Sequence, residues 1–130
     1  GSANPRLVAP VLKMLDDPDW WLRVTACETL AKLKDRRVVP RLIKALDDED
    51  TRWAAIDTLG QLGGDEAVSA LLGLLRDPRP EVRLEAVQVC ARTDDPRVAP
   101  MLRQMVEGDA DQEVRTRVVE LLREEGLFLR

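Results

Sequence analysis

Histidine and tyrosine are absent from this chain of 130 residues, phenylalanine occurs once and cysteine only twice. Without histidine, no serine, threonine or cysteine has an imidazole that would activate it as a nucleophile. Cys27 and Cys90 are far apart and lack the Cys-x-x-Cys spacing of a zinc or redox site. We expect both to be buried thiols in a reducing cytosol. The sequence therefore predicts a protein that is not an enzyme, with no metal and no cofactor.

Long apolar runs and an excess of basic charge are also missing. No apolar run approaches the eighteen or so residues that a membrane span needs, and no signal peptide is visible. The net charge of -4 disfavours binding to nucleic acid or to an anionic membrane. We expect a cytoplasmic protein that binds neither. The opening Gly1-Ser2 is interpreted as a cloning scar.

What the sequence does contain is a repeat of about thirty residues. Valine and leucine recur thirty residues apart at Val8, Val38, Val68 and Val98, and at Leu12, Leu42, Leu72 and Leu102. A second series follows at spacings of 29, 31 and 32, formed by Arg23, Arg52, Arg83 and Arg115. A period between about twenty and fifty residues indicates a protein of stacked repeats, in which each unit buries its apolar side against its neighbours.

Each repeat reads as two helices joined by an acidic turn. Asn4-Pro5 and Asp95-Pro96 are typical of a helix start, and prolines at positions 10, 40 and 100 should bend the first helices near their beginnings. We expect four hairpins at about 4–34, 35–64, 65–94 and 95–126, with about eight helices in all. They should form one domain over 4–126 that stacks as a right-handed solenoid, followed by a tail at 127–130.

The segments DPRVAPML (95–102), PEVRLEAV (80–87) and DEAVSALLGLLRDP (65–78) carry the repeat most clearly. The pattern resembles the short HEAT-like repeats of bacterial and archaeal scaffolds, phycobilin lyase subunits and engineered binders of the alpha-Rep type. The resemblance implies an all-α solenoid of four HEAT-like hairpins and leaves the function open. The chain departs from the pattern at Thr51, at Trp20-Trp21 and in the apolar tail Leu127-Phe128-Leu129.

The arginine series occupies one fixed place near the start of every second helix. Each of these arginines should reach the acidic turn before it, where aspartates recur, because a guanidinium suits carboxylates and carbonyls at a bend. We interpret Arg23, Arg52, Arg83 and Arg115 as a structural ladder that locks unit to unit. A basic strip for phosphates is the alternative, and the neighbouring carboxylates argue against it.

The three tryptophans all lie on second helices. In HEAT-like binding proteins the second helices line the concave surface, and the resemblance implies partner contacts at fixed positions around the repeat arginine. Carried over to this sequence, these positions include Trp20, Trp21, Val24, Glu28, Trp53, Asp57, Leu84 and Glu85. The five apolar members would form a patch edged by the three acids, and tryptophan is over-represented at binding hot spots. The alternative is that these rings cover hairpin ends or fill gaps.

The leading hypothesis is therefore a non-enzymatic module that binds a protein or peptide with basic and apolar residues, since cations pair with indoles and carboxylates. A second hypothesis is an accessory segment of a larger repeat protein, or a homodimer formed through the tryptophans or the tail. A HEAT-like DNA glycosylase or a chromophore lyase subunit is a third, which rests on analogy alone.

Overall fold

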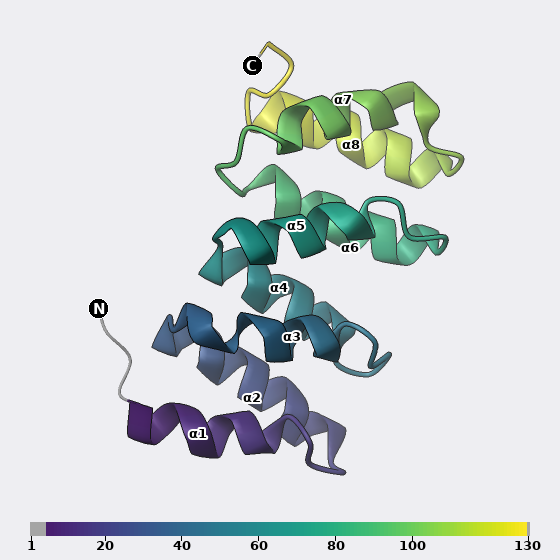
Figure 1. Cartoon of the computed structure of the whole chain (residues 1–130). Coiled ribbons are helices and arrows are strands. Elements are labelled where there is room, and N and C mark those ends of the chain that lie inside the picture. The colour runs from purple at the N-terminus through teal and green to yellow at the C-terminus, as the bar shows by residue number, and fades with distance from the viewer. Residues whose placement is uncertain (1–4, 130) are drawn as a thin grey trace. The chain divides into compact units, whose positions relative to one another are not determined.

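The computed structural model describes residues 5–129, which form eight α-helices and one short 3-10 helix, η1 (Figure 1). The predicted all-α fold of helical hairpins is confirmed. Gly1–Asn4 and Arg130 lie outside the described residues, so the interpretation of a scar at 1–2 and of an N-cap at Asn4 falls outside them as well. The elements are α1 Pro5–Met14, α2 Trp20–Leu33, η1 Arg36–Val38, α3 Val39–Ala45, α4 Arg52–Leu62, α5 Asp65–Leu74, α6 Pro80–Ala91, α7 Val98–Gly108 and α8 Gln112–Glu124.

The chain divides into two compact units, Gly1–Ala67 and Val68–Arg130. In the first unit, α2 packs against α1 and α4, and α4 also packs against α3. In the second unit, α8 packs against α6 and α7, and α6 also contacts α7. Within each unit, the second helix of one hairpin therefore lies against the second helix of the next. The single domain expected over residues 4–126 stays a prediction.

The periodic apolar residues form the cores of these units, as the repeat predicts. In the first unit the fully buried large side chains come from α2, η1, α3 and α4: Val24, Leu30, Val38, Leu42, Ile56 and Leu59. In the second unit they come from α5 to α8: Leu71, Val87, Val98, Leu102, Leu121 and Leu122. Burying a side chain of this kind contributes about 1.5–3 kcal/mol, so the helices are held mainly by packing between layers.

The prolines of the first helices occupy three different places. Pro10 lies inside α1, whereas Pro40 is the second residue of α3, because residues 36–38 form the 3-10 turn first. Pro100 is the third residue of α7. Proline is tolerated in the first turn, where its missing N–H would have no partner within the helix. Only Pro10 therefore falls in a helix interior, where the bend that the sequence predicts would arise.

An aspartate organises six of the turns in the same way, whereas Gly63 and Gly64 form the turn between α4 and α5. The side-chain Oδ1 of this aspartate accepts a hydrogen bond of 2.9–3.1 Å from the backbone N–H two residues later. This Asx turn bends the chain with a local bond that needs no other helix. The six aspartates that form it are Asp17, Asp35, Asp48, Asp77, Asp95 and Asp109.

The repeat arginines are fixed to the turns that precede their helices. Each guanidinium donates to the backbone carbonyl six residues before it, at 2.7 Å for Arg23, Arg52 and Arg115 and at 2.8 Å for Arg83. The sequence predicted a contact between each arginine and the preceding acidic turn. In the structure this contact is made to a main-chain oxygen, so it needs no carboxylate at that place.

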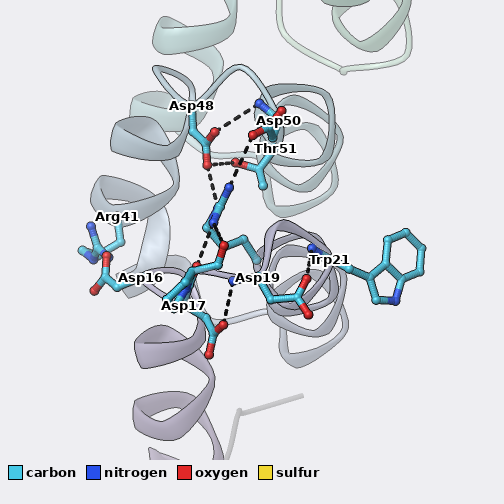
Figure 2. Close-up of polar contacts among 10 residues, drawn as sticks. Asp16, Asp17, Asp19, Trp21, Arg41, Asp48, Asp50 and Thr51 are labelled. Atoms are coloured by element: carbon cyan, nitrogen blue, oxygen red, sulfur yellow. Dashed lines mark hydrogen bonds and ion pairs between the residues drawn. The ribbon is translucent and has the colours of Figure 1, made fainter.

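Two of the arginines also reach the following hairpin of the same unit. Arg23 Nε donates to Asp48 Oδ2 at 2.8 Å, and the same oxygen accepts the Thr51 hydroxyl at 2.8 Å. Asp50 lies 3.6 Å from the same guanidinium. Figure 2 shows Asp48, Asp50 and Thr51 gathered above the turn of the first hairpin, with Asp17 below them. The first hairpin is thereby joined to the second by a charged network.

Arg83 makes the corresponding contact in the second unit. Its Nε and Nη2 donate to the two oxygens of Asp109, both at 2.9 Å, and only 4% of the Asp109 side chain is exposed. Burial raises the pKa of this carboxyl, but the hydrogen bonds from Arg83 and from the Asp111 N–H outweigh it and hold the pKa below 3.8. The pKa of Asp48 is lowered in the same way, since hydrogen bonds from Thr51, Asp50 and Arg23 outweigh its burial.

Candidate protein-binding surface

One stripe of α2 is open to solvent. Trp21, Glu28 and Lys32 are exposed and Thr25 is half-buried, at spacings of four, three and four residues that place them on one side of a helix. Asp19 caps this helix, since its Oδ1 accepts the Trp21 N–H at 2.9 Å. The Trp21 indole points away from the charged network of the turn, as Figure 2 shows. The stripe therefore presents an aromatic ring, a carboxylate and an ammonium group.

Trp20 and Trp21 form an aromatic pair at the start of α2. Their ring centroids are 5.5 Å apart and the planes meet at 82°, which is the edge-to-face arrangement that indoles favour. Trp20 is 49% exposed and Trp21 55%. Each tryptophan therefore keeps about half of its surface in water.

A second open stripe follows α4. Trp53, Asp57 and Gln61 are exposed at intervals of four residues. Trp53 is 45% exposed, and Asp57 lies one helical turn further along the same side. Because α2 and α4 pack directly against each other, the first unit carries both stripes on neighbouring helices. Glu28 and Asp57 give each stripe a carboxylate.

Val24 was predicted to join this surface, and that prediction is wrong because the side chain is fully buried. Val24 shares one side of α2 with Cys27 and Ala31, at spacings of three and four residues. The Cys27 carbonyl accepts the Thr58 hydroxyl of α4 at 3.0 Å, so this side of α2 faces α4. Val24 is part of the packing between the two helices and contributes to the core of the first unit.

Leu84 and Glu85 belong to the second unit and are both half-buried. Leu84 lines an open groove of about 610 Å³ between α6 and α8. The other lining residues are Gln88, Asp111, Gln112, Glu113, Thr116, Arg117 and Glu120. Glu85 is not among them. The predicted site residues therefore fall into two groups: five exposed side chains in the first unit, and Leu84 with Glu85 in the second.

The groove carries more acid than base. Three carboxylates and one guanidinium line it, and Arg117 is engaged with Glu120 at 3.8 Å, with Glu124 at 3.6 Å and with the Gln88 amide at 3.3 Å. Sequence reasoning missed the α8 side of this groove because the fourth repeat has no aromatic residue to draw attention to it. The sequence did contain a signal for this side. Five of the α8 residues that line the groove occupy, around Arg115, the positions at which the resemblance places partner contacts around the other arginines.

The described residues offer little for covalent chemistry. Burial raises the pKa of Cys27 to about 11 and that of Cys90 to about 12, so both thiols stay protonated near neutral pH. Within residues 5–129, no group of three or more His, Cys, Asp or Glu side chains is placed to hold a metal ion. Among the helices of this part of the chain, none has the length and apolar character of a membrane span.

Comparison with known proteins agrees with the helical hairpins. Two curated relatives are phycocyanobilin lyase alpha subunits, one from Nostoc sp. (25% identical over 121 residues) and one from Synechocystis sp. (46% identical over 56 residues). These matches cover 82% and 38% of this chain, and 44% and 21% of the relatives, so the chain spans less than half of their length. The HEAT-repeat family matches residues 1–51 and 43–123, almost the whole sequence, and the chain therefore belongs to the HEAT-repeat family.

Proposed function

We propose that this chain is a non-enzymatic interaction module that binds a protein segment on the open stripes of α2 and α4. A HEAT-repeat scaffold is a stack of hairpins whose rigid helices present side chains at regular intervals. The observation that carries the proposal is the exposure of all three indoles, at 49%, 55% and 45%, on second helices of one unit. Exposed tryptophans on a rigid support are typical of binding hot spots.

The charges next to the indoles define the partner. Glu28 and Asp57 are exposed beside Trp21 and Trp53, one or two helical turns along the same stripes. A lysine or arginine of the partner would meet an indole and a carboxylate together, and apolar side chains would cover the remaining ring surface. The partner we propose is therefore a peptide segment that carries lysine or arginine among apolar residues.

A displayed library of random peptides tests this proposal. We expect selection on the folded chain to enrich peptides with lysine or arginine among apolar residues, and binding to change the tryptophan emission. Trp21→Ala and Trp53→Ala should each lower the affinity for the selected peptides by about thirtyfold, which is the effect of removing a hot-spot residue. Phe128→Ala is the matched control, because Phe128 is a similarly exposed aromatic residue at 43% in the other unit. Unchanged affinity in both tryptophan variants would contradict the proposal.

The similarity to lyase subunits supports a second candidate. In this view the chain is an accessory segment of a larger repeat protein that handles a linear tetrapyrrole, and the exposed indoles would stack on the chromophore instead of a peptide. Adding phycocyanobilin to the chain tests it by the change in the visible absorption of the chromophore. A shift that disappears in Trp21→Ala would favour this candidate, and an unchanged spectrum would refute it.

A further inference from the structure

The groove between α6 and α8 combines one apolar side chain with polar walls. Leu84 of α6 is half-buried and lines the groove, whose volume of about 610 Å³ is within the range of ligand-binding clefts. The α8 side chains that line it form two rows at four-residue spacing, so both rows lie on one side of the helix. The first row is Gln112, Thr116 and Glu120, and the second is Glu113 and Arg117.

Arg117 is the guanidinium that lines the groove, and it is directed away from the start of α8. It follows Glu113 by four residues, a spacing that favours an ion pair between the two. In the structure its contacts are instead to Gln88 of α6 at 3.3 Å, to Glu120 at 3.8 Å and to Glu124 at 3.6 Å. Arg117 therefore leaves the charge of Glu113 without a counterion.

Two carboxylates at the start of α8 are in this position. Asp111 caps the helix with one oxygen, which accepts a backbone N–H at 3.0 Å, and Glu113 is exposed. Neither carboxylate forms a salt bridge in the part of the chain that the structure describes. The guanidinium groups of Arg83 and Arg115 lie at the same turn, but both donate to Asp109, at 2.9 and 2.7 Å.

These groups define the charge of a ligand that fits the groove. A carboxylate only accepts hydrogen bonds, and the donors of Arg117 are already engaged, so a ligand must bring positive charge and N–H donors of its own. Leu84 offers apolar surface, on which the aliphatic part of a long basic side chain packs well. A planar guanidinium suits carboxylates better than an ammonium group does. An anion would meet carboxylates that already repel one another.

We infer that this groove binds an arginine side chain of a partner segment, with the guanidinium on Asp111 and Glu113 and the aliphatic stem on Leu84. The inference deepens the proposed function and rests on it for the kind of partner, a peptide with basic residues among apolar ones. It gives the second unit a contact of its own, made by residues that lie on neither α2 nor α4.

A nuclear magnetic resonance titration tests where the arginine binds. The probe is a short synthetic peptide with one arginine between leucine and alanine residues, added to the isotope-labelled chain. A matched peptide carries citrulline, which keeps the shape of arginine and lacks its charge. We expect the arginine peptide to shift the backbone amides of Leu84, Glu113 and Thr116, and the citrulline peptide to bind at least about fivefold more weakly. Equal affinities, or no shift of these amides at millimolar peptide, would overturn the inference.

Reversing one charge tests the role of Glu113. Glu113→Lys should lower the affinity for the arginine peptide by about tenfold, and a peptide with glutamate in place of arginine should bind this variant better than the wild type. Glu107→Lys is the matched control, because it makes the same change at an exposed position of α7 outside the groove. Its affinity should stay within about twofold of the wild type. Equal losses in the two variants would indicate general attraction to an acidic chain and would overturn the inference.

The same spectra separate this inference from the proposed function. Shifts confined to α2, α4 and the indole N–H groups would overturn the contact in the groove and leave the proposed function standing. Shifts confined to α6 and α8 would support the groove and contradict binding by the tryptophans. Far-UV circular dichroism checks that Glu113→Lys and Glu107→Lys are folded.

Discussion

Removing the guanidinium of Arg23 tests the contacts that join the first two hairpins. Its Nε donates to Asp48, and its Nη1 donates to the Asp17 carbonyl at 2.7 Å and to the Pro18 carbonyl at 3.1 Å. The arginine side chain is 17% exposed and that of Asp48 33%. Arg23→Ala should therefore disrupt the turn and the link between hairpins together.

The expected magnitude follows from these contacts. A hydrogen bond to a charged group contributes about 1.5–3 kcal/mol, and the two turn carbonyls can return partly to water when the guanidinium is removed. We expect Arg23→Ala to lower the free energy of unfolding by about 2–3 kcal/mol in total. Arg23→Lys keeps the charge but loses the planar fork, so it should fall between the alanine variant and the wild type.

Arg41→Ala is the matched control. Arg41 also joins the second hairpin to the first, through one hydrogen bond of 2.9 Å to Asp16, but 77% of the Asp16 side chain is exposed. An exposed pair of this kind contributes about 0–1 kcal/mol, because water competes for both groups. Figure 2 shows Arg41 and Asp16 together at the side of the network, away from Trp21. The two arginines thus differ mainly in burial and in the number of partners.

Tryptophan fluorescence during urea unfolding is a suitable assay, because all three tryptophans lie in the first unit. The emission therefore reports the unit that contains Arg23 and Arg41, while far-UV circular dichroism reports both units. A double-mutant cycle with Asp48→Ala separates the bond between hairpins from the bonds to the turn. Equal losses of stability in Arg23→Ala and Arg41→Ala would refute the reasoning that burial makes this arginine important.

Three further predictions concern acid, thiols and the tryptophan surface. The pKa values of Asp48 and Asp109 are lowered in the folded chain, so their contribution to stability is present above the ordinary value of 3.8 and is lost as pH falls below it. The urea concentration at the unfolding midpoint should be constant between about pH 5 and 8 and should decrease when the pH is lowered under about 4. The decrease should be less steep in Asp109→Asn. Ellman's reagent at about pH 8 should leave Cys27 and Cys90 unmodified in the native chain and modify both in urea; fast native reaction would contradict their burial. Val24→Ala should lower the free energy of unfolding by about 1–3 kcal/mol without changing peptide affinity. Trp53→Ala should lower peptide affinity without changing the free energy of unfolding, and melting and binding measurements on both variants would show the difference.

The helical hairpins were predictable because each one repeats the same apolar periodicity between the same turn residues. The first and last residues of the helices were less predictable. The aspartate and proline pattern did not reveal that residues 36–38 would form a 3-10 turn and place Pro40 at the start of α3, because proline is compatible with both arrangements. Sequence spacing marks the presence of an element more reliably than its first residue.

The surface was predictable at some residues and not at others. Adjacent residues of a helix such as Trp20 and Trp21 cannot both point into one core, and all three indoles are exposed. Val24 follows Arg23 as Trp53 follows Arg52, but it lies on the side of α2 that packs on α4. The position of a residue in the repeat does not determine how much room the neighbouring helix leaves for its side chain. Binding by the exposed tryptophans remains a proposal.

The partners of the arginines were also predictable only in part. A series of arginines near aspartates predicted contacts with acidic turns, but the carboxylates that bind Arg23 and Arg83 come from the hairpins that follow, 25 and 26 residues later. Several aspartates recur in each turn, and the sequence alone does not tell which of them lies across a layer. The contact six residues back is made to the main chain, which has no signature in the sequence at all.

The bond from each repeat arginine to its own turn makes every hairpin independent in one respect. The arginine and the carbonyl that it binds belong to the same repeat of about thirty residues. A duplicated repeat would therefore contain both groups that fix the shape of its turn. The aspartate that receives an arginine from the layer before it must still match its neighbour, as must the side chains that pack between the layers. Gene duplication in such a protein can therefore lengthen the array without redesigning its corners.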